Sequence, residues 1–67
     1  MQIIYNGQPR VVAESTKTIA DLVAELGLRP QLVAVEVNGQ LVPRGKHASQ
    51  LLSNGDQLEI VTLVGGG

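Results

Sequence analysis

The sequence predicts an α+β fold in which a mixed five-strand sheet packs on one main helix. Three features support this prediction: two short aliphatic runs folded about Asn-Gly dipeptides, an amphipathic segment between them, and a final aliphatic run. Neither hairpin can bury its apolar face alone, so the helix must cover one face of a sheet to which both hairpins contribute. With 67 residues, the chain has room for a single domain.

Residues 1–13 predict an antiparallel hairpin, because two β-rich runs flank the first Asn-Gly dipeptide. This dipeptide suits the positive φ values of a two-residue turn. Two-residue alternation places Met1, Ile3 and Tyr5 on one face of the first strand and Ile4 on the other. Ile4 is therefore expected to be exposed or to be covered by another element.

Residues 15–28 predict an amphipathic helix. Thr18 is a suitable N-cap, and Asp21 occupies the position at which a capping box places an acidic or amide side chain. Gly27 is expected to end the helix, with Leu28 folding back on the last turn. The apolar stripe recurs at helical spacing and comprises Ile19, Leu22, Val23 and Leu26.

Residues 32–44 predict a second hairpin, with alternate valines on one face and Ala34 and Glu36 on the other. Pro43 has no N–H to donate, so the strand after the turn should be short and lie at an edge of the sheet. The segment that follows is rich in turn residues, and one helical turn is expected at residues 48–52.

Residues 57–64 predict the last strand, with Leu58, Ile60 and Thr62 on its core face and Glu59, Val61 and Leu63 on the other. Pairing with the first strand would place it in the middle of the sheet. An α+β roll of this kind, with one helix held by a curved sheet, is the β-grasp fold. We expect residues 1–64 to form this domain and residues 65–67 to form a flexible glycine tail.

The composition argues against several classes of function. The five Lys and Arg residues are dispersed, the formal net charge is −1, and Tyr5 is the sole aromatic residue, which gives nucleic-acid binding little support. Cysteine is absent, and His47 lies in a turn-rich segment, where it is expected at the surface and not in a metal site. Asp21 and Glu25 are expected to be solvated and not to form a catalytic pair. No membrane span or secretion signal is evident, so we expect a cytoplasmic protein.

In the order of its segments, the sequence is similar to the ubiquitin-like sulfur carriers, most closely to the ThiS family of thiamine biosynthesis. The similarity covers the whole chain, and its specificity comes from segment order, total length and the glycine end together. The segments that carry it are MQI in the first strand, TIADLVAEL in the helix, VAVEVNGQLVPR in the second hairpin and GDQLEIVTLVGG at the end.

The resemblance implies a protein cosubstrate, not an enzyme, with no bound cofactor. Family members end in a diglycine whose carboxylate is the working group, so the thiocarboxylate site is expected at Gly67. Gly65 and Gly66 are then expected to thread into partner active sites, since residues without Cβ fit a narrow channel. Gly65 and Gly66 would themselves be the functional pair if Gly67 were an added or processed residue.

Three partners follow from the same resemblance. An ubiquitin-activating-like enzyme would use ATP to adenylate the carboxylate, and a persulfide donor of the cysteine desulfurase or rhodanese type would deliver sulfur. Thiazole synthase would then receive the sulfur. The candidate interface for these partners comprises Ile4, Val61, Leu63 and Val64, which are aliphatic residues on the less polar sheet face and at its exit.

Other classes of function share parts of this pattern. The small subunit of a molybdopterin synthase has the same tail chemistry but forms a stable complex with a large subunit. A ubiquitin-type modifier would form high-mass conjugates through an isopeptide bond to lysine. A scaffold role would predict no effect of deleting Gly67. Composition and spacing do not distinguish thiamine from molybdopterin as the destination of the sulfur.

Overall fold

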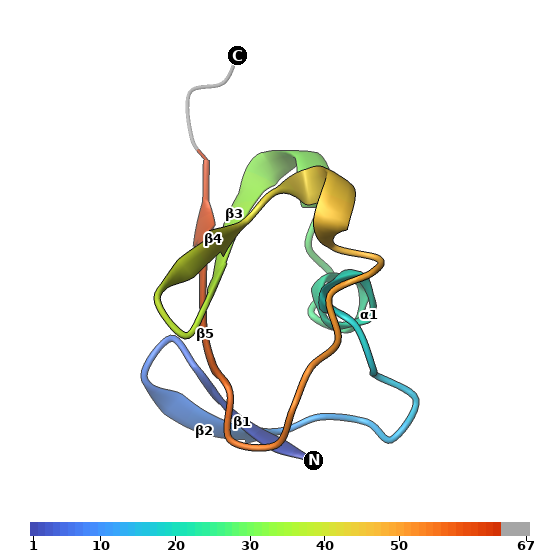
Figure 1. Cartoon of the computed structure of the whole chain (residues 1–67), viewed down its shortest axis with the longest axis vertical. Helices are drawn as coiled ribbons and strands as arrows, with labels where there is room; N and C mark the ends of the chain where they lie inside the picture. Colours follow the sequence, from blue (N-terminus) through green and yellow to red (C-terminus); the bar gives the residue numbers. More distant parts are fainter. Residues whose placement is uncertain (64–67) are drawn as a thin grey trace.

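The structure is a computed structural model that describes residues 1–63. Within these residues, a curved five-stranded mixed sheet faces the helix α1, which lies across its concave side (Figure 1). This is the predicted β-grasp architecture. The elements in chain order are β1 (Gln2–Tyr5), β2 (Gln8–Val11), α1 (Ile19–Glu25), the 3-10 helix η1 (Pro30–Leu32), β3 (Val33–Val37), β4 (Gln40–Val42), the 3-10 helix η2 (Arg44–Lys46) and β5 (Gln57–Thr62).

The last strand, β5, occupies the centre of the sheet, whose order is β2-β1-β5-β3-β4. It runs parallel to β1 and antiparallel to β3. Strand β4 has three residues, lies at the edge and stops before Pro43, as its missing N–H predicts. The central position of β5 means that the chain leaves the sheet from its middle.

Both predicted Asn-Gly turns are present. The φ angles are 48° and 83° at Asn6 and Gly7, and 51° and 85° at Asn38 and Gly39. Positive values at both central residues are those of a type I′ turn, whose twist matches that of the strands it joins.

The two asparagines also fasten β5 through their side chains. The Asn6 amide accepts a hydrogen bond from Ile60 N at 2.8 Å and donates to Ile60 O at 3.1 Å. The Asn38 side-chain oxygen accepts from Gln57 N at 3.0 Å. Each hairpin turn therefore contributes to the position of the central strand, a role that turn propensity alone does not predict.

The helix begins and ends with the predicted caps. The Thr18 hydroxyl accepts a hydrogen bond from Asp21 N, and the Asp21 carboxylate accepts from Thr18 N, which completes a capping box. At the other end, Gly27 has a φ of 73°, and Leu28 N donates to Val23 O, the pattern of a Schellman motif. These caps stabilise a helix of seven residues that is too short to persist alone.

The core lies between α1 and the concave face of the sheet. The predicted alternation of buried and exposed residues holds throughout β3 and up to Ile60 in β5, whereas Thr62, predicted on the core face, is exposed at the end of the strand. The predicted stripe of α1 is buried at three positions, with Leu26 partly buried at the end. The largest fully buried side chains of the core are Ile3, Ile19, Leu22, Val23, Val35 and Leu58.

The helical turn expected at residues 48–52 is a wrong prediction. The turn occurs earlier, at Arg44–Lys46, where Pro43 has already ended β4. Residues 50–52 are held extended instead, because Ile19 N donates to Gln50 O and Leu52 N donates to Lys17 O. Pairing with the segment before α1 therefore overrides the local helical preference.

His47 is buried, with 4% of its surface exposed, which corrects the prediction of a surface residue. Its ring Nε2 lies 3.1 Å from Val42 O, and its backbone carbonyl accepts a hydrogen bond from Ala20 N in the first turn of α1. His47 thus joins η2, the end of β4 and the start of the helix. Its Nδ1 has no hydrogen-bond partner among the described residues.

Asp21 and Glu25 do not form a pair with each other. Glu25 accepts hydrogen bonds from the Thr16 hydroxyl and from Ala13 N, while Asp21 accepts from Lys17 N and Thr18 N. Both carboxylates are exposed, as expected, but they also hold the segment that precedes α1 against the helix.

Replacing Asp21 by Asn should make helix capping insensitive to acid. Backbone hydrogen bonds from Lys17 and Thr18 lower the pKa of Asp21 below its ordinary value of 3.8. A lowered folded-state pKa gives stability that is present above the unfolded value and lost as pH falls through the folded value. Thermal melting from about pH 7 to about pH 2 should therefore show Asp21→Asn less stable near neutrality and equal to wild type in acid. A constant difference across this range would contradict the assignment.

Candidate docking face

Strand β5 carries the chain to the predicted tail. Antiparallel pairing with β3 extends along its length, and Leu63 N still donates to Leu32 O at 2.7 Å after the strand ends. The chain is thus held by the sheet up to the last described residue. The predicted site residues Val64, Gly65, Gly66 and Gly67 lie outside the described residues.

Two exposed aliphatic side chains lie at the end of β5 and directly after it. Val61 is 56% exposed and Leu63 is 51% exposed, whereas Leu58 and Ile60 on the opposite face of β5 are buried. The outward placement of Val61 and Leu63 is the predicted one. Both residues therefore remain available for contact with another protein immediately before the tail.

Ile4 does not join this pair, although all three were predicted to form one interface. It is half-buried, and its partner in the parallel ladder is Gln57, at the opposite end of β5 from Val61. Gln57 and Val61 are four positions apart along β5, a distance of about 13 Å. Ile4 shares the sheet face with Val61 and Leu63 but lies apart from them along β5.

The neighbours of Val61 and Leu63 are instead a residue of β3 and a residue that directly precedes β3. Ala34 lies directly opposite Val61 in the ladder, and Leu32 is exposed beside Leu63. Alternation along the sequence predicts that Ala34 points outward. Only the register of β3 against β5 shows that Ala34 lies beside Val61. We call Leu32, Ala34, Val61 and Leu63 the docking face.

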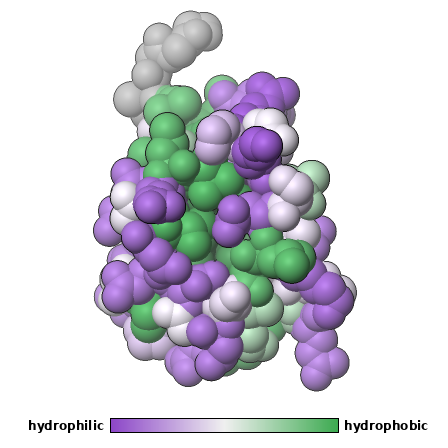
Figure 2. All heavy atoms as spheres, in the orientation of Figure 1, coloured by the Kyte–Doolittle hydropathy of each residue, from purple (hydrophilic) through white to green (hydrophobic). Residues whose placement is uncertain are grey.

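Hydrophobic atoms gather at the end of the molecule where β5 stops (Figure 2). Three residues of the docking face, Leu32, Val61 and Leu63, are exposed large apolar residues. Apolar groups grouped in this way on a protein surface commonly mark a contact with another protein.

The described residues contain no group of three or more His, Cys, Asp or Glu side chains that could hold a metal ion. A hollow of about 280 Å³ lies between β4 and the segment around residues 46–50, and none of the docking-face residues lines it. Within residues 1–63, no helix combines the length and apolarity required to cross a membrane.

The fold and the exit of its central strand define a ubiquitin-like β-grasp protein. The crystal structure of the thiamine biosynthesis protein ThiS from Geobacter metallireducens superposes with a TM-score of 0.84 at 28% identity, covering 100% of both chains. The solution structure of a thiamine biosynthesis protein from the same organism gives a TM-score of 0.82.

Sequence comparison identifies the family. Residues 3–67 match the ThiS family, and the chain belongs to it. The sulfur carrier protein ThiS of Escherichia coli K12 is 33% identical over 67 residues, which cover 100% of both chains. A thiazole synthase of Paramagnetospirillum magneticum is 40% identical over the same length, but the chain spans only 20% of that protein. A thiazole synthase of Magnetococcus marinus shows the same relation, with 42% identity and 20% of its length covered.

Proposed function

We propose that this chain is a sulfur carrier of thiamine biosynthesis and that its working group is the carboxylate of Gly67. The observation that carries the proposal is the family match, which extends through residue 67 and includes the glycines. The full-length similarity to a named sulfur carrier supports it. The β-grasp body would then serve to present the tail to partner enzymes.

The chemistry requires activation, because a carboxylate is ionised at neutral pH and is a poor electrophile. A carboxylate oxygen of Gly67 would attack the α-phosphorus of ATP on an adenylating partner, releasing pyrophosphate. The terminal sulfur of a partner's persulfide would then attack the carbonyl carbon and release AMP. A thiol of a partner would cleave the resulting acyl disulfide, forming a disulfide itself and leaving the thiocarboxylate.

Thiazole synthase is the destination that the relatives favour. Two proteins with that name contain a segment similar to this whole chain within a protein about five times as long. A carrier segment joined to its acceptor would deliver sulfur at a high effective concentration. This supports a thiazole destination over a molybdopterin one.

The adenylation step tests the proposal. With the purified adenylating enzyme and labelled pyrophosphate, the wild-type chain should support exchange of label into ATP, and omission of the chain should abolish it. A chain that supports no exchange would contradict the carrier function. Stable co-purification with a large catalytic subunit would indicate the molybdopterin alternative, and conjugates of high mass would indicate a modifier.

A further inference from the structure

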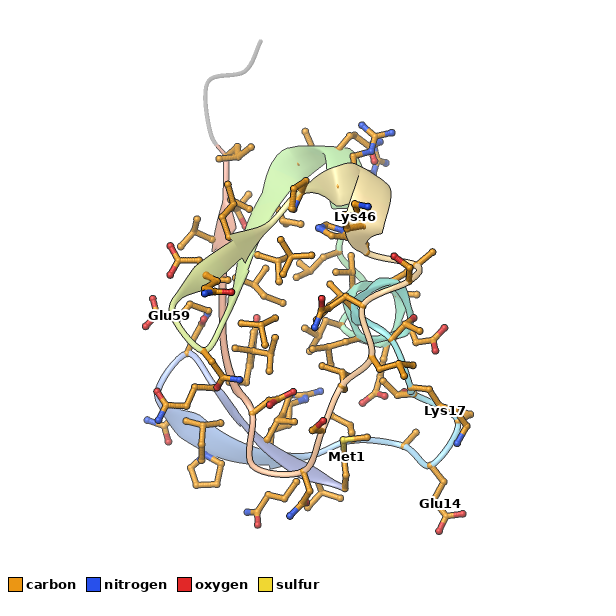
Figure 3. The ribbon with its side chains drawn as sticks, in the orientation of Figure 1. Met1, Glu14, Lys17, Lys46 and Glu59 are labelled. Atoms are coloured by element: carbon orange, nitrogen blue, oxygen red, sulfur yellow. The ribbon has the colours of Figure 1, made fainter. Side chains whose placement is uncertain are left out.

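Two carboxylates face each other on the outer surface of the sheet. Glu36 of β3 and Glu59 of β5 are direct partners in the antiparallel ladder, and both are exposed. The residues on either side of them along each strand are buried, so both side chains lie on the outward face. Glu59 points away from the helix side of the sheet (Figure 3).

The surrounding strands supply no opposite charge to this pair. Strands β1, β3, β4 and β5 contain neither Lys nor Arg. Arg10 of β2 pairs with the core-facing Ile3, and its guanidinium carbon lies 5.8 Å from the centre of the Tyr5 ring. The other ladder neighbour of Glu36 is Leu41, which is 65% exposed.

Like charges directly opposite on adjacent strands destabilise a sheet. Opposed glutamates are therefore an unfavourable choice for β3 and β5, the two strands that carry Ala34 and Val61. The surrounding strands place no cation beside them that would offset the repulsion. Local rules broken without internal compensation are expected at functional positions. The described residues also offer no third ligating side chain that would complete a metal site here.

We propose that Glu36 and Glu59 together bind one arginine side chain of the adenylating enzyme. This inference rests on the proposed function and names the contact through which that partner recognises the docking face. Side chains directly opposite in an antiparallel ladder have Cβ atoms about 5 Å apart, so one planar guanidinium can donate to both carboxylates. A lysine ammonium lacks this planar arrangement of N–H donors.

Position and charge both favour the adenylating enzyme. The ladder pair Ala34 and Val61 lies two residues along the strands from the carboxylates, so the acidic pair and the docking face are continuous. An enzyme that brings ATP and the Gly67 carboxylate together must concentrate positive charge around its site. That field would attract the acidic pair and orient the carrier before the apolar contact forms.

Four variants test the contact: Glu36→Gln, Glu59→Gln, the double variant, and Glu14→Gln as a matched control. Glu14 is exposed in the segment before α1, on the other side of the molecule from Glu59 (Figure 3). Chemical unfolding measures stability, and titration with the purified adenylating enzyme of the same organism measures the dissociation constant at low and high salt.

Each sheet variant should unfold at a higher denaturant concentration than wild type because repulsion is relieved, yet bind the enzyme about tenfold more weakly. The double variant should also lose most of the salt dependence seen for wild type. Glu14→Gln should leave both properties unchanged. A purely structural role would not make stability and binding change in opposite senses.

Normal pyrophosphate exchange by wild type combined with equally tight binding of the double variant would overturn this inference and leave the carrier function intact. Weakened binding to thiazole synthase alone, or reduced stability of the single variants, would also overturn it. Absence of exchange with wild type would refute the proposed function and this contact together.

Discussion

A Gly66→Val variant should keep an unmodified terminus after incubation with the adenylating enzyme, ATP and the persulfide donor, whereas the wild-type chain should gain sulfur. Valine adds a β-branched side chain next to the reacting carboxylate and restricts the backbone. A channel that admits glycines has no space for that branch. We expect a loss of at least a hundredfold in the rate of thiocarboxylate formation, measured by intact mass, since small misplacement of reacting atoms has effects of this size.

The matched control is Gly45→Val in η2. A Cβ at Gly45 would meet no atom within 4 Å, and the residue does not have a positive φ. This variant should fold and acquire sulfur at the wild-type rate. Normal thiocarboxylate formation by Gly66→Val would contradict the view that the tail enters a narrow partner site.

A Val61→Asp variant should bind the adenylating enzyme much more weakly while remaining folded. Val61 is 56% exposed and lies opposite Ala34, so its replacement leaves the core intact but places a charge in the centre of the docking face. Burying an unpaired carboxylate in an apolar contact is unfavourable. A loss of about 2 kcal/mol, typical of a residue central to an interface, corresponds to about thirtyfold in the dissociation constant.

Val11→Asp provides the comparison for this substitution. Val11 is 75% exposed at the end of the edge strand β2, away from the docking face. It should bind the enzyme as the wild-type chain does in the same titration. Equal weakening by both variants would indicate a general charge effect and would count against a localised docking face.

Residues that lie close together in the sequence were sufficient to predict most of the fold. Asn-Gly dipeptides predicted both type I′ turns, and Thr18 with Asp21 predicted the capping box. Pro43 predicted the end of β4. These features depend on residues close together in the chain, which is why they can be read without tertiary information.

The missed features depend on contacts between distant segments. His47 is buried because η2 packs between β4 and the start of α1, and nothing in its immediate sequence indicates this arrangement. The side chain of Asn6 binds Ile60, which is 54 residues further along the chain. The side chain of Asn38 binds Gln57, which is 19 residues further along the chain.

The candidate site also combines features that the sequence predicted with features that depend on contacts between distant segments. Alternation correctly placed Val61 and Leu63 on the outward face, but only the strand register shows that Ala34 adjoins them and that Ile4 does not. The opposition of Glu36 and Glu59 likewise requires that register. The glycine tail was predicted from sequence, and its chemistry remains a prediction.

The most direct test of the carrier function is the intact mass of the protein isolated from cells with an active thiamine pathway, with fragmentation of its last residues. The account predicts a population in which one oxygen has been exchanged for sulfur, localised to Gly67. An unmodified terminus in such cells, or a terminus joined to a lysine of another protein, would contradict it.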